Sequence, residues 1–220
     1  PYLLFNLQLD RRLDEDTSAL AEYLSSLPGG GGRIMLEDSG WNDRDGGPPR
    51  YSESHFPSLL ADITGKEFIG GPYPYVFLEH HYADFHDGKF LGKPLGEYSA
   101  EQLEDAMDEY AIHWIVCWSG DCLDTFSSQE SAGSVALDRK IGKFSVYRRT
   151  GPPPGMFLKG NGYAVADHRG IRCFRVEPEG GEAILKYHAF EGLEVRGGGT
   201  AEKMGNAGDP VGFLRIADPS

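Results

Sequence analysis

The clearest pattern of apolar and polar positions in the chain lies between residues 99 and 119. In its first half, apolar positions recur at four-residue spacing: Leu103, Met107 and Ala111. Ser99 provides a capping residue ahead of them, so this half predicts an amphipathic helix with one apolar stripe. The run from 112 to 118 is short and rich in β-branched and aromatic residues, which predicts a strand buried on both faces. A helix followed directly by a buried strand is half of an α/β unit.

The first 150 residues continue this alternation of helices and strands. Helices are predicted over 16–27, 55–63 and 121–129, and strands over 33–37, 66–69 and 141–148. Parallel strands near 33–37, 66–69 and 112–118 would form the middle of a small three-layer domain. Residues 72–98 are expected to be a long irregular connection that carries aromatic and histidine side chains. Such connections in compact domains are usually functional or form a surface for a partner.

The pattern changes after residue 150. The segment Thr150-Gly-Pro-Pro-Pro-Gly155 is typical of a linker, and only strand and turn patterns follow it. Several short strands at close spacing favour a small β-sandwich. The fold class is therefore predicted as α/β followed by all-β, with an α/β domain over 10–149 and a β-sandwich domain over 150–218.

Charge separates the same two regions. The chain has a net charge of −13, and residues 1–110 hold 21 acidic against 8 basic side chains, whereas the remainder holds 13 of each. A nucleic-acid-binding protein would need a basic face, so nucleic acid is not expected as a partner. No run approaches the roughly 18 apolar residues of a membrane-spanning helix. Because the sequence begins at Pro1 rather than Met, we expect it to be a piece of a longer or processed product.

Two arrangements of the three cysteines are compatible with their spacing. Cys117 and Cys122 are close enough in sequence to form a disulfide across a turn, which would leave Cys173 as a free thiol. Alternatively all three are thiols, with Cys117 in the core, and this second arrangement is the one favoured.

The densest set of candidate metal ligands comprises His80, His81, Asp84 and His86. Three imidazoles and a carboxylate within seven residues suit zinc or manganese, although the spacing matches no established signature. No other cofactor is expected. Contact with a glycan and a plain surface loop are the two alternatives, and the surface loop is the favoured one.

Aromatic residues beside these groups suit a sugar, which stacks on rings and hydrogen-bonds to carboxylates and imidazoles. The candidate ligand-binding residues are therefore Trp41, Tyr73, Tyr75, His80, His81, Tyr82, Asp84 and His86. His113 and His188 lie on predicted strands and are expected to be structural. No catalytic residue is assigned.

The order of several motifs resembles the extracytoplasmic C-terminal part of bacterial polytopic membrane proteins related to C-fold glycosyltransferases of the dolichyl-phosphate-mannose-protein mannosyltransferase type. These motifs are LPGGGGRIMLEDS, HFPSLLADITGKEFIGGPYP, EYAIHWIVCWS, ILKYHAFEGL and DPVGFLRI. The resemblance covers most of residues 17–217. It implies a domain attached to the last transmembrane helix of a lipid-linked sugar transferase.

In such enzymes the catalytic carboxylate lies on a loop of the membrane part, so the resemblance carries no catalytic residue onto this chain. It implies a non-catalytic domain on the extracytoplasmic face that supports glycan or acceptor binding. Its partners would be the transmembrane part of the same polypeptide and a glycan or polypeptide acceptor. Two alternatives stay open: a free-standing metal-dependent hydrolase that uses the cluster at 80–87, and a carbohydrate-binding module with no enzyme attached.

Overall fold

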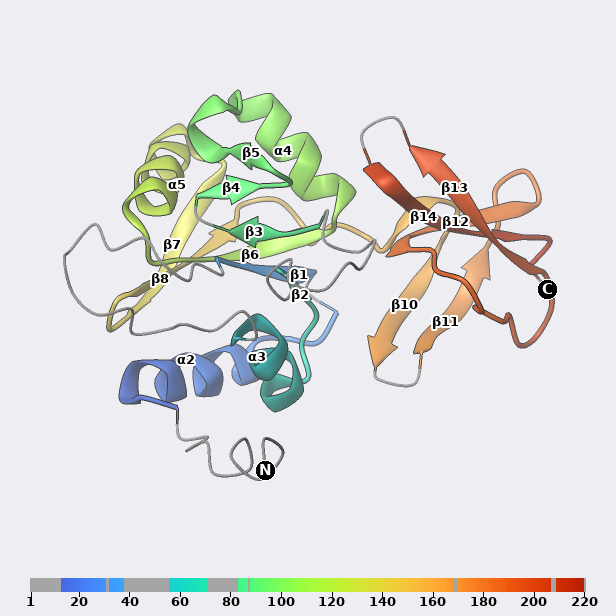
Figure 1. The fold of residues 1–220 in the computed structure, drawn as a ribbon, viewed down its shortest axis with the longest axis horizontal. Coiled ribbons are helices and arrows are strands. Elements are labelled where there is room, and N and C mark those ends of the chain that lie inside the picture. Colours follow the sequence, from blue (N-terminus) through green and yellow to red (C-terminus); the bar gives the residue numbers. More distant parts are fainter. Residues whose placement is uncertain are drawn as a thin grey trace, which may run out of the picture.

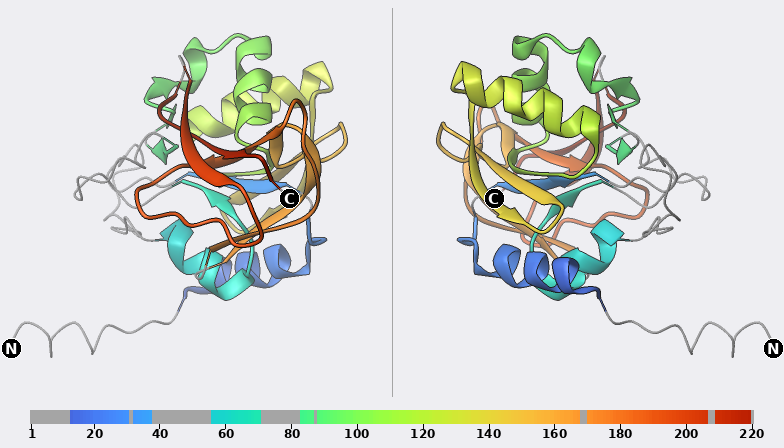
Figure 2. Two further views of the ribbon diagram at one scale, coloured as in Figure 1. Left: turned by 90° about the vertical axis from the view of Figure 1, so that its right-hand side faces the viewer. Right: turned by 90° about the vertical axis from the view of Figure 1, so that its left-hand side faces the viewer.

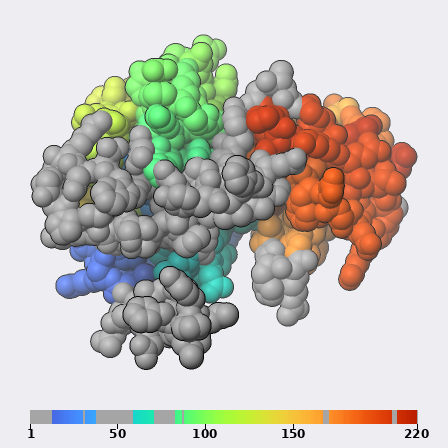
Figure 3. All heavy atoms as spheres, viewed as in Figure 1, coloured from blue at the N-terminus to red at the C-terminus, as the bar shows by residue number. Residues whose placement is uncertain are grey.

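The computed structural model of the protein describes residues 13–30, 32–37, 56–70, 83–86, 88–167, 170–206 and 209–219. A five-stranded sheet with helices on both faces is followed by strands alone, so the fold class α/β followed by all-β is confirmed (Figure 1). In the space-filling view, the strands after residue 156 form a lobe beside the α/β part (Figure 3). None of the helices in these ranges is long and apolar enough to cross a bilayer.

The central sheet has the strand order β2-β1-β6-β8-β7. Its strands are β1 (Arg33–Leu36), β2 (Phe68–Ile69), β6 (Ile112–Cys117), β7 (Val135–Ile141) and β8 (Phe144–Arg149). β1 pairs in parallel with β2 and β6, as predicted, but β8 is antiparallel to β6 and forms a hairpin with β7. The sheet is therefore mixed rather than parallel. The sequence did not reveal β7 because this edge strand is largely exposed and lacks an apolar alternation.

Helices cover both faces of this sheet. They are α2 (Glu15–Ser26), α3 (Phe56–Thr64), α4 (Ala100–Glu109) and α5 (Gly120–Ala132). In two orthogonal views α2 and α3 lie on one face and α4 and α5 on the other (Figures 1 and 2). Alternate residues of β6 supply the two cores: Trp114 and Val116 pack toward α2, whereas Ile115 and Cys117 pack toward α4 and α5. The capping box at Ser99 forms as the sequence predicts.

The second half of the predicted irregular connection is folded. It forms β3 (Phe85–His86), β4 (Lys89–Phe90), β5 (Lys93–Pro94) and the 3-10 helix η2 (Leu95–Glu97). Phe85 and Phe90 are fully buried and pack edge to face, with 6.3 Å between ring centroids. Gly88 and Gly92 adopt positive φ in the two turns. Strands of two residues are too short to show a period, so the expectation of an irregular segment is wrong for 85–97.

The C-terminal part consists of strands only. They are β9 (Phe157–Lys159), β10 (Asn161–Asp167), β11 (Gly170–Glu177), β12 (Glu182–His188), β13 (Thr200–Asn206) and β14 (Asp209–Ala217). A four-stranded sheet β13-β14-β12-β9 and the hairpin β10-β11 share a small core around Ala164, Leu185 and Leu214. Ile184 and Phe213 instead join the core beneath α4, so the two parts share apolar packing. The division into domains at residue 150 stays a prediction.

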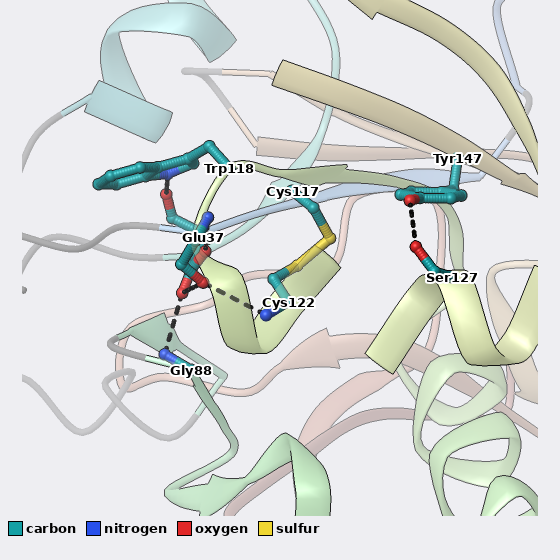
Figure 4. Close-up of a disulfide and its surroundings, with 8 residues drawn as sticks. Glu37, Gly88, Cys117, Trp118, Cys122, Ser127 and Tyr147 are labelled. Carbon is teal, nitrogen blue, oxygen red and sulfur yellow. Dashed lines mark hydrogen bonds between the residues drawn. A yellow bond between two sulfur atoms is a disulfide. The ribbon is translucent and has the colours of Figure 1, made fainter. Parts of the chain in front are cut away.

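A disulfide and a buried carboxylate stabilise the carboxyl ends of β1 and β6. Cys117 and Cys122 form a disulfide, which corrects the expectation of three thiols (Figure 4). Beside it, the carboxylate of Glu37 accepts hydrogen bonds from Gly88 N at 3.0 Å and from Ser119 Oγ at 2.8 Å. Ser119 also caps α5. Glu37 therefore joins β1, the β3–β4 turn and the start of α5.

We predict that Glu37→Gln lowers the free energy of unfolding by about 1.5–3 kcal/mol, because an amide presents donors to groups that themselves donate. Chemical denaturation measures the change. Glu22→Gln on the exposed face of α2 is the matched control and should stay within about 0.5 kcal/mol of the parent. Equal stability of Glu37→Gln and Glu22→Gln would contradict this role.

Candidate functional site

A cavity of about 330 Å³ lies where the edge of the central sheet meets the C-terminal strands. We call it the junction cleft, and it is lined by residues of β1, α3, the segment around β2, the end of α4, β10 and β12. Three cationic side chains contribute to the lining, together with one carboxylate: Arg33, Lys66, Lys186 and Glu67. Rings line it as well: Tyr110, Tyr187 and His188.

Arg33 is buried at the start of β1 and contacts both parts of the protein. Its Nε donates to Glu67 Oε2 at 3.1 Å, and its Nη1 donates to Tyr110 O at 3.0 Å and to Lys186 O at 2.6 Å. The guanidinium also lies over the ring of Tyr187, 4.5 Å from the centroid. These contacts fix the guanidinium at the wall of the junction cleft.

Glu67 completes this network from the other side. Its Oε1 accepts hydrogen bonds from Tyr187 OH at 2.7 Å and from Ala166 N at 2.9 Å. Burial, and then the nearby Glu67 carboxylate, raise the pKa of Tyr187 well above its usual value. Tyr187 therefore keeps its proton and donates to Glu67 at any physiological pH.

Two of the rings contact a fully buried carboxylate, that of Asp209. Asp209 Oδ2 accepts from Tyr110 OH at 2.6 Å and lies 2.6 Å from His188 Nε2, while its Oδ1 accepts from Val211 N at 2.8 Å. Burial opposes ionisation of Asp209, but the hydrogen bonds from Tyr110 and His188 outweigh it and lower the pKa of Asp209. The ionised carboxylate thus orients two rings that line the junction cleft.

Lys186 lies on β12 between these two networks. The residue is 8% exposed, and its Nζ donates to the carbonyl oxygen of Asp108. Burial lowers the pKa of Lys186, and Arg33 and Arg149 lower it further, against the opposing effect of Asp108 and Glu109. The junction cleft thus combines a fixed guanidinium and aromatic rings with Lys186, whose ammonium bonds to the end of α4.

Most of the ligand-binding residues predicted from the sequence lie outside the described residues. These are Trp41, Tyr73, Tyr75, His80, His81 and Tyr82. Asp84 and His86 are described: both are half-buried, and His86 belongs to β3. The neighbouring Ala83 lines the junction cleft, so the predicted loop reaches its rim.

Two of the four predicted metal ligands can be compared with the structure. Asp84 and His86 flank Phe85, whose ring is fully buried. Within the described ranges, no three side chains of His, Cys, Asp or Glu gather in a way that could hold a metal ion. His80 and His81 fall outside those ranges, so the metal site stays a prediction.

Sequence reasoning missed the central residues of the junction cleft. Arg33 and Lys186 both stand within apolar strand runs, in RIML and AILKYH. A cation in a buried strand is uncommon and needs a partner, so this feature could have identified both positions. His188, expected to be structural, bonds to Asp209 and also lines the junction cleft.

The chain matches no protein-family model, and comparisons with curated proteins and with solved structures found no significant similarity. The resemblance to membrane glycosyltransferases therefore stays a prediction. A function has to be inferred from the chemistry of the junction cleft.

The lowered pKa of Asp209 predicts how its contribution to stability depends on pH. Because the folded-state pKa lies below the unfolded one, the ionised carboxylate stabilises the fold above the ordinary carboxyl pKa of about 3.9. That stabilisation is lost as the pH falls through the folded-state pKa. The difference in unfolding free energy between the parent and Asp209→Asn should therefore be largest near neutral pH and shrink in acid.

Denaturation between about pH 2.5 and pH 7 measures this difference. Asp124→Asn at an exposed position of α5 provides the control, and its unfolding free energy should stay close to that of the parent. A difference for Asp209→Asn that is constant across the range would show that its ionisation is not coupled to folding.

Proposed function

We propose that this chain is a non-catalytic, extracytoplasmic domain of a membrane glycosyltransferase-like protein, and that it binds a glycan or acceptor in the junction cleft. The observation that carries the proposal is the cleft itself, a cavity of about 330 Å³ that combines rings with fixed polar groups. Small-ligand sites are typically concavities of roughly this size or larger, with a few polar groups that fix orientation.

The chemistry of the lining suits a sugar. Tyr187 presents ring surface, and the charged side chains of Arg33, Glu67 and Lys186 contribute to the lining. Networks on both sides hold these groups in place, so a ligand meets a preorganised surface and little rotamer freedom is lost on binding.

The polar groups of the junction cleft favour binding over catalysis. Glu67 uses both carboxylate oxygens, because Arg33, Tyr187 and Ala166 all donate to it. Asp209 is enclosed by Tyr110, His188 and backbone donors. Neither carboxylate is therefore well placed to take a proton from a substrate as a general base.

Two observations support the extracytoplasmic location and the parent protein. The order of the motifs resembles the C-terminal part of the mannosyltransferase type described above, and the partner would then be the transmembrane part of the same polypeptide. The Cys117–Cys122 disulfide is compatible with an oxidising compartment, where such bonds persist.

Blocking the cavity tests the proposal without changing its charges. Ala61 lines the junction cleft from α3, and Ala61→Phe should weaken binding of any glycan found on an array at least tenfold by calorimetry, because the ring occupies the site. Ala132→Phe at the exposed end of α5 is the matched control and should bind as the parent does. No binding across a broad array, or equal binding by both variants, would overturn the proposal.

A carbohydrate-binding module with no enzyme attached is the second candidate, and one observation favours it. Tyr163 and Phe174 face each other across the β10–β11 hairpin, about half exposed, with ring centroids 6.1 Å apart and planes tilted by 34°. Such a pair offers a platform on which sugar rings can stack.

Pull-down on insoluble polysaccharide distinguishes this platform from the junction cleft. The double variant Tyr163→Ser/Phe174→Ser should lose retention if the platform binds the polysaccharide, whereas Ala61→Phe should not. Unchanged retention of the double variant would show that the two rings do not bind the polysaccharide. Their role would then be the cross-strand contact that stabilises the hairpin.

A further inference from the structure

A second cavity, of about 570 Å³, lies beside the amino end of β6 and shares no lining residue with the junction cleft. We call it the bulge cavity. Its floor consists of His113 and Trp114, which are only 3% and 6% exposed. Its rim is exposed and comprises Asp138 of β7, Arg148 of β8, Pro28 and the segment 150–153.

Two β-bulges direct side chains to this cavity. Between Ile112 and Trp114 the pairing of β6 with β1 shifts by one residue, so His113 is an extra residue in β6. Because of this bulge, the neighbours His113 and Trp114 line the same cavity, although regular alternation would place them on opposite faces. Asp138 interrupts the pairing of β7 with β8 in the same way. Bulges are frequent next to functional sites, where they redirect a side chain.

The imidazole of His113 is left unsatisfied by the fold. Its Nδ1 is enclosed and has no hydrogen-bond partner within the described residues. Burial lowers the pKa of His113, and the charges of Arg148 and Arg149 lower it further, so the ring is neutral at pH 7. A buried nitrogen without a partner costs stability, and a ring that no hydrogen bond holds can turn a nitrogen toward a ligand.

Arg148 supplies a positive charge beside this ring. It pairs directly opposite Trp114, so the two side chains lie on the same face of the sheet. The side chain of Arg148 is 48% exposed, and its Nε lies 4.0 Å from Asp138 Oδ1, which is too far for a hydrogen bond. The other oxygen of Asp138 accepts from Tyr23 OH. Within the described part of the chain, the guanidinium of Arg148 therefore makes no hydrogen bond.

We propose that the bulge cavity binds a small organic acid, whose carboxylate pairs with Arg148 and reaches the imidazole of His113. The two oxygens of a carboxylate match the planar donors of a guanidinium, whereas a single cation with Asp138 beside it disfavours a phosphate dianion. The prolines of the rim and the ring of Trp114 form a rigid apolar wall, which suits a flat apolar ligand body. This site is independent of the proposed glycan function.

Calorimetry and NMR titration of the purified chain test the proposal with benzoate, its uncharged analogue benzamide, and phenyl phosphate. We expect benzoate to bind at least about tenfold more tightly than benzamide, and to shift the ring signals of His113 and the indole signal of Trp114. Arg148→Gln should weaken benzoate at least about tenfold. Arg196→Gln, at an exposed position between β12 and β13, is the matched control and should bind as the parent does.

The midpoint of thermal unfolding separates a lost contact from a damaged fold. Arg148→Gln should unfold at the temperature of the parent, because its guanidinium has no hydrogen bond to lose. A markedly less stable Arg148→Gln would show that this group serves the fold, and would contradict the assignment. Ala61→Phe, which fills the junction cleft, should leave the binding of benzoate unchanged, so the site is tested whether or not the chain binds a glycan.

Several results would overturn the inference. They are the absence of benzoate binding, equal affinity for benzoate and benzamide, equal effects of Arg148→Gln and Arg196→Gln, and signals of His113 and Trp114 that do not move. Phenyl phosphate that binds more tightly than benzoate would overturn the choice of a carboxylate.

Discussion

The guanidinium of Arg33 is the group on which the arrangement of the protein most depends. It belongs to β1, pairs with the residue that precedes β2, and donates to carbonyl groups at the end of α4 and on β12. Its planar set of donors can satisfy several acceptors at once, which a lysine could not do in the same place. The position of the C-terminal strands relative to the central sheet therefore rests on polar contacts as well as on shared packing by Ile184 and Phe213.

This polar junction explains why a cavity occurs at this point. Apolar side chains pack against one another without voids. Side chains that make directed hydrogen bonds are held in a fixed geometry and leave space between them. The networks around Glu67 and Asp209 are each satisfied internally, so the rings and the guanidinium they position face the cleft as a rigid lining. Lys186 bonds through its ammonium to the carbonyl oxygen of Asp108 at the end of α4.

The sequence predicted the elements that carry a long, regular pattern. The helix before β6 shows a four-residue period and a capping box, and β6 is apolar at every position except His113, so both were placed correctly. β7 and the two-residue strands β3–β5 were missed because an exposed edge strand and very short strands carry no readable period. The favoured state of Cys117 and Cys122 was wrong, since sequence spacing permits a bridge without requiring one.

The candidate site was harder to predict than the fold. Arg33 and Lys186 are 153 residues apart in the sequence, and only folding brings the guanidinium of Arg33 to the carbonyl oxygen of Lys186. The predicted ligand loop contributes Ala83 to the rim of the junction cleft, which agrees with a functional role for this region but does not identify its ligand. A cation inside an apolar strand was the one local feature that marked the site.

The central claim is that the junction between the α/β part and the C-terminal strands is the binding site. Amide chemical shifts of ¹⁵N-labelled protein during a titration with a glycan identified on the array test this most directly. The account predicts saturable shifts that concentrate at Gly70, Ala166 and Tyr187, whose residues line the junction cleft, with little change in the β7–β8 hairpin. Shifts that concentrate in that hairpin or on the β10–β11 platform, or no shifts at all, would contradict it.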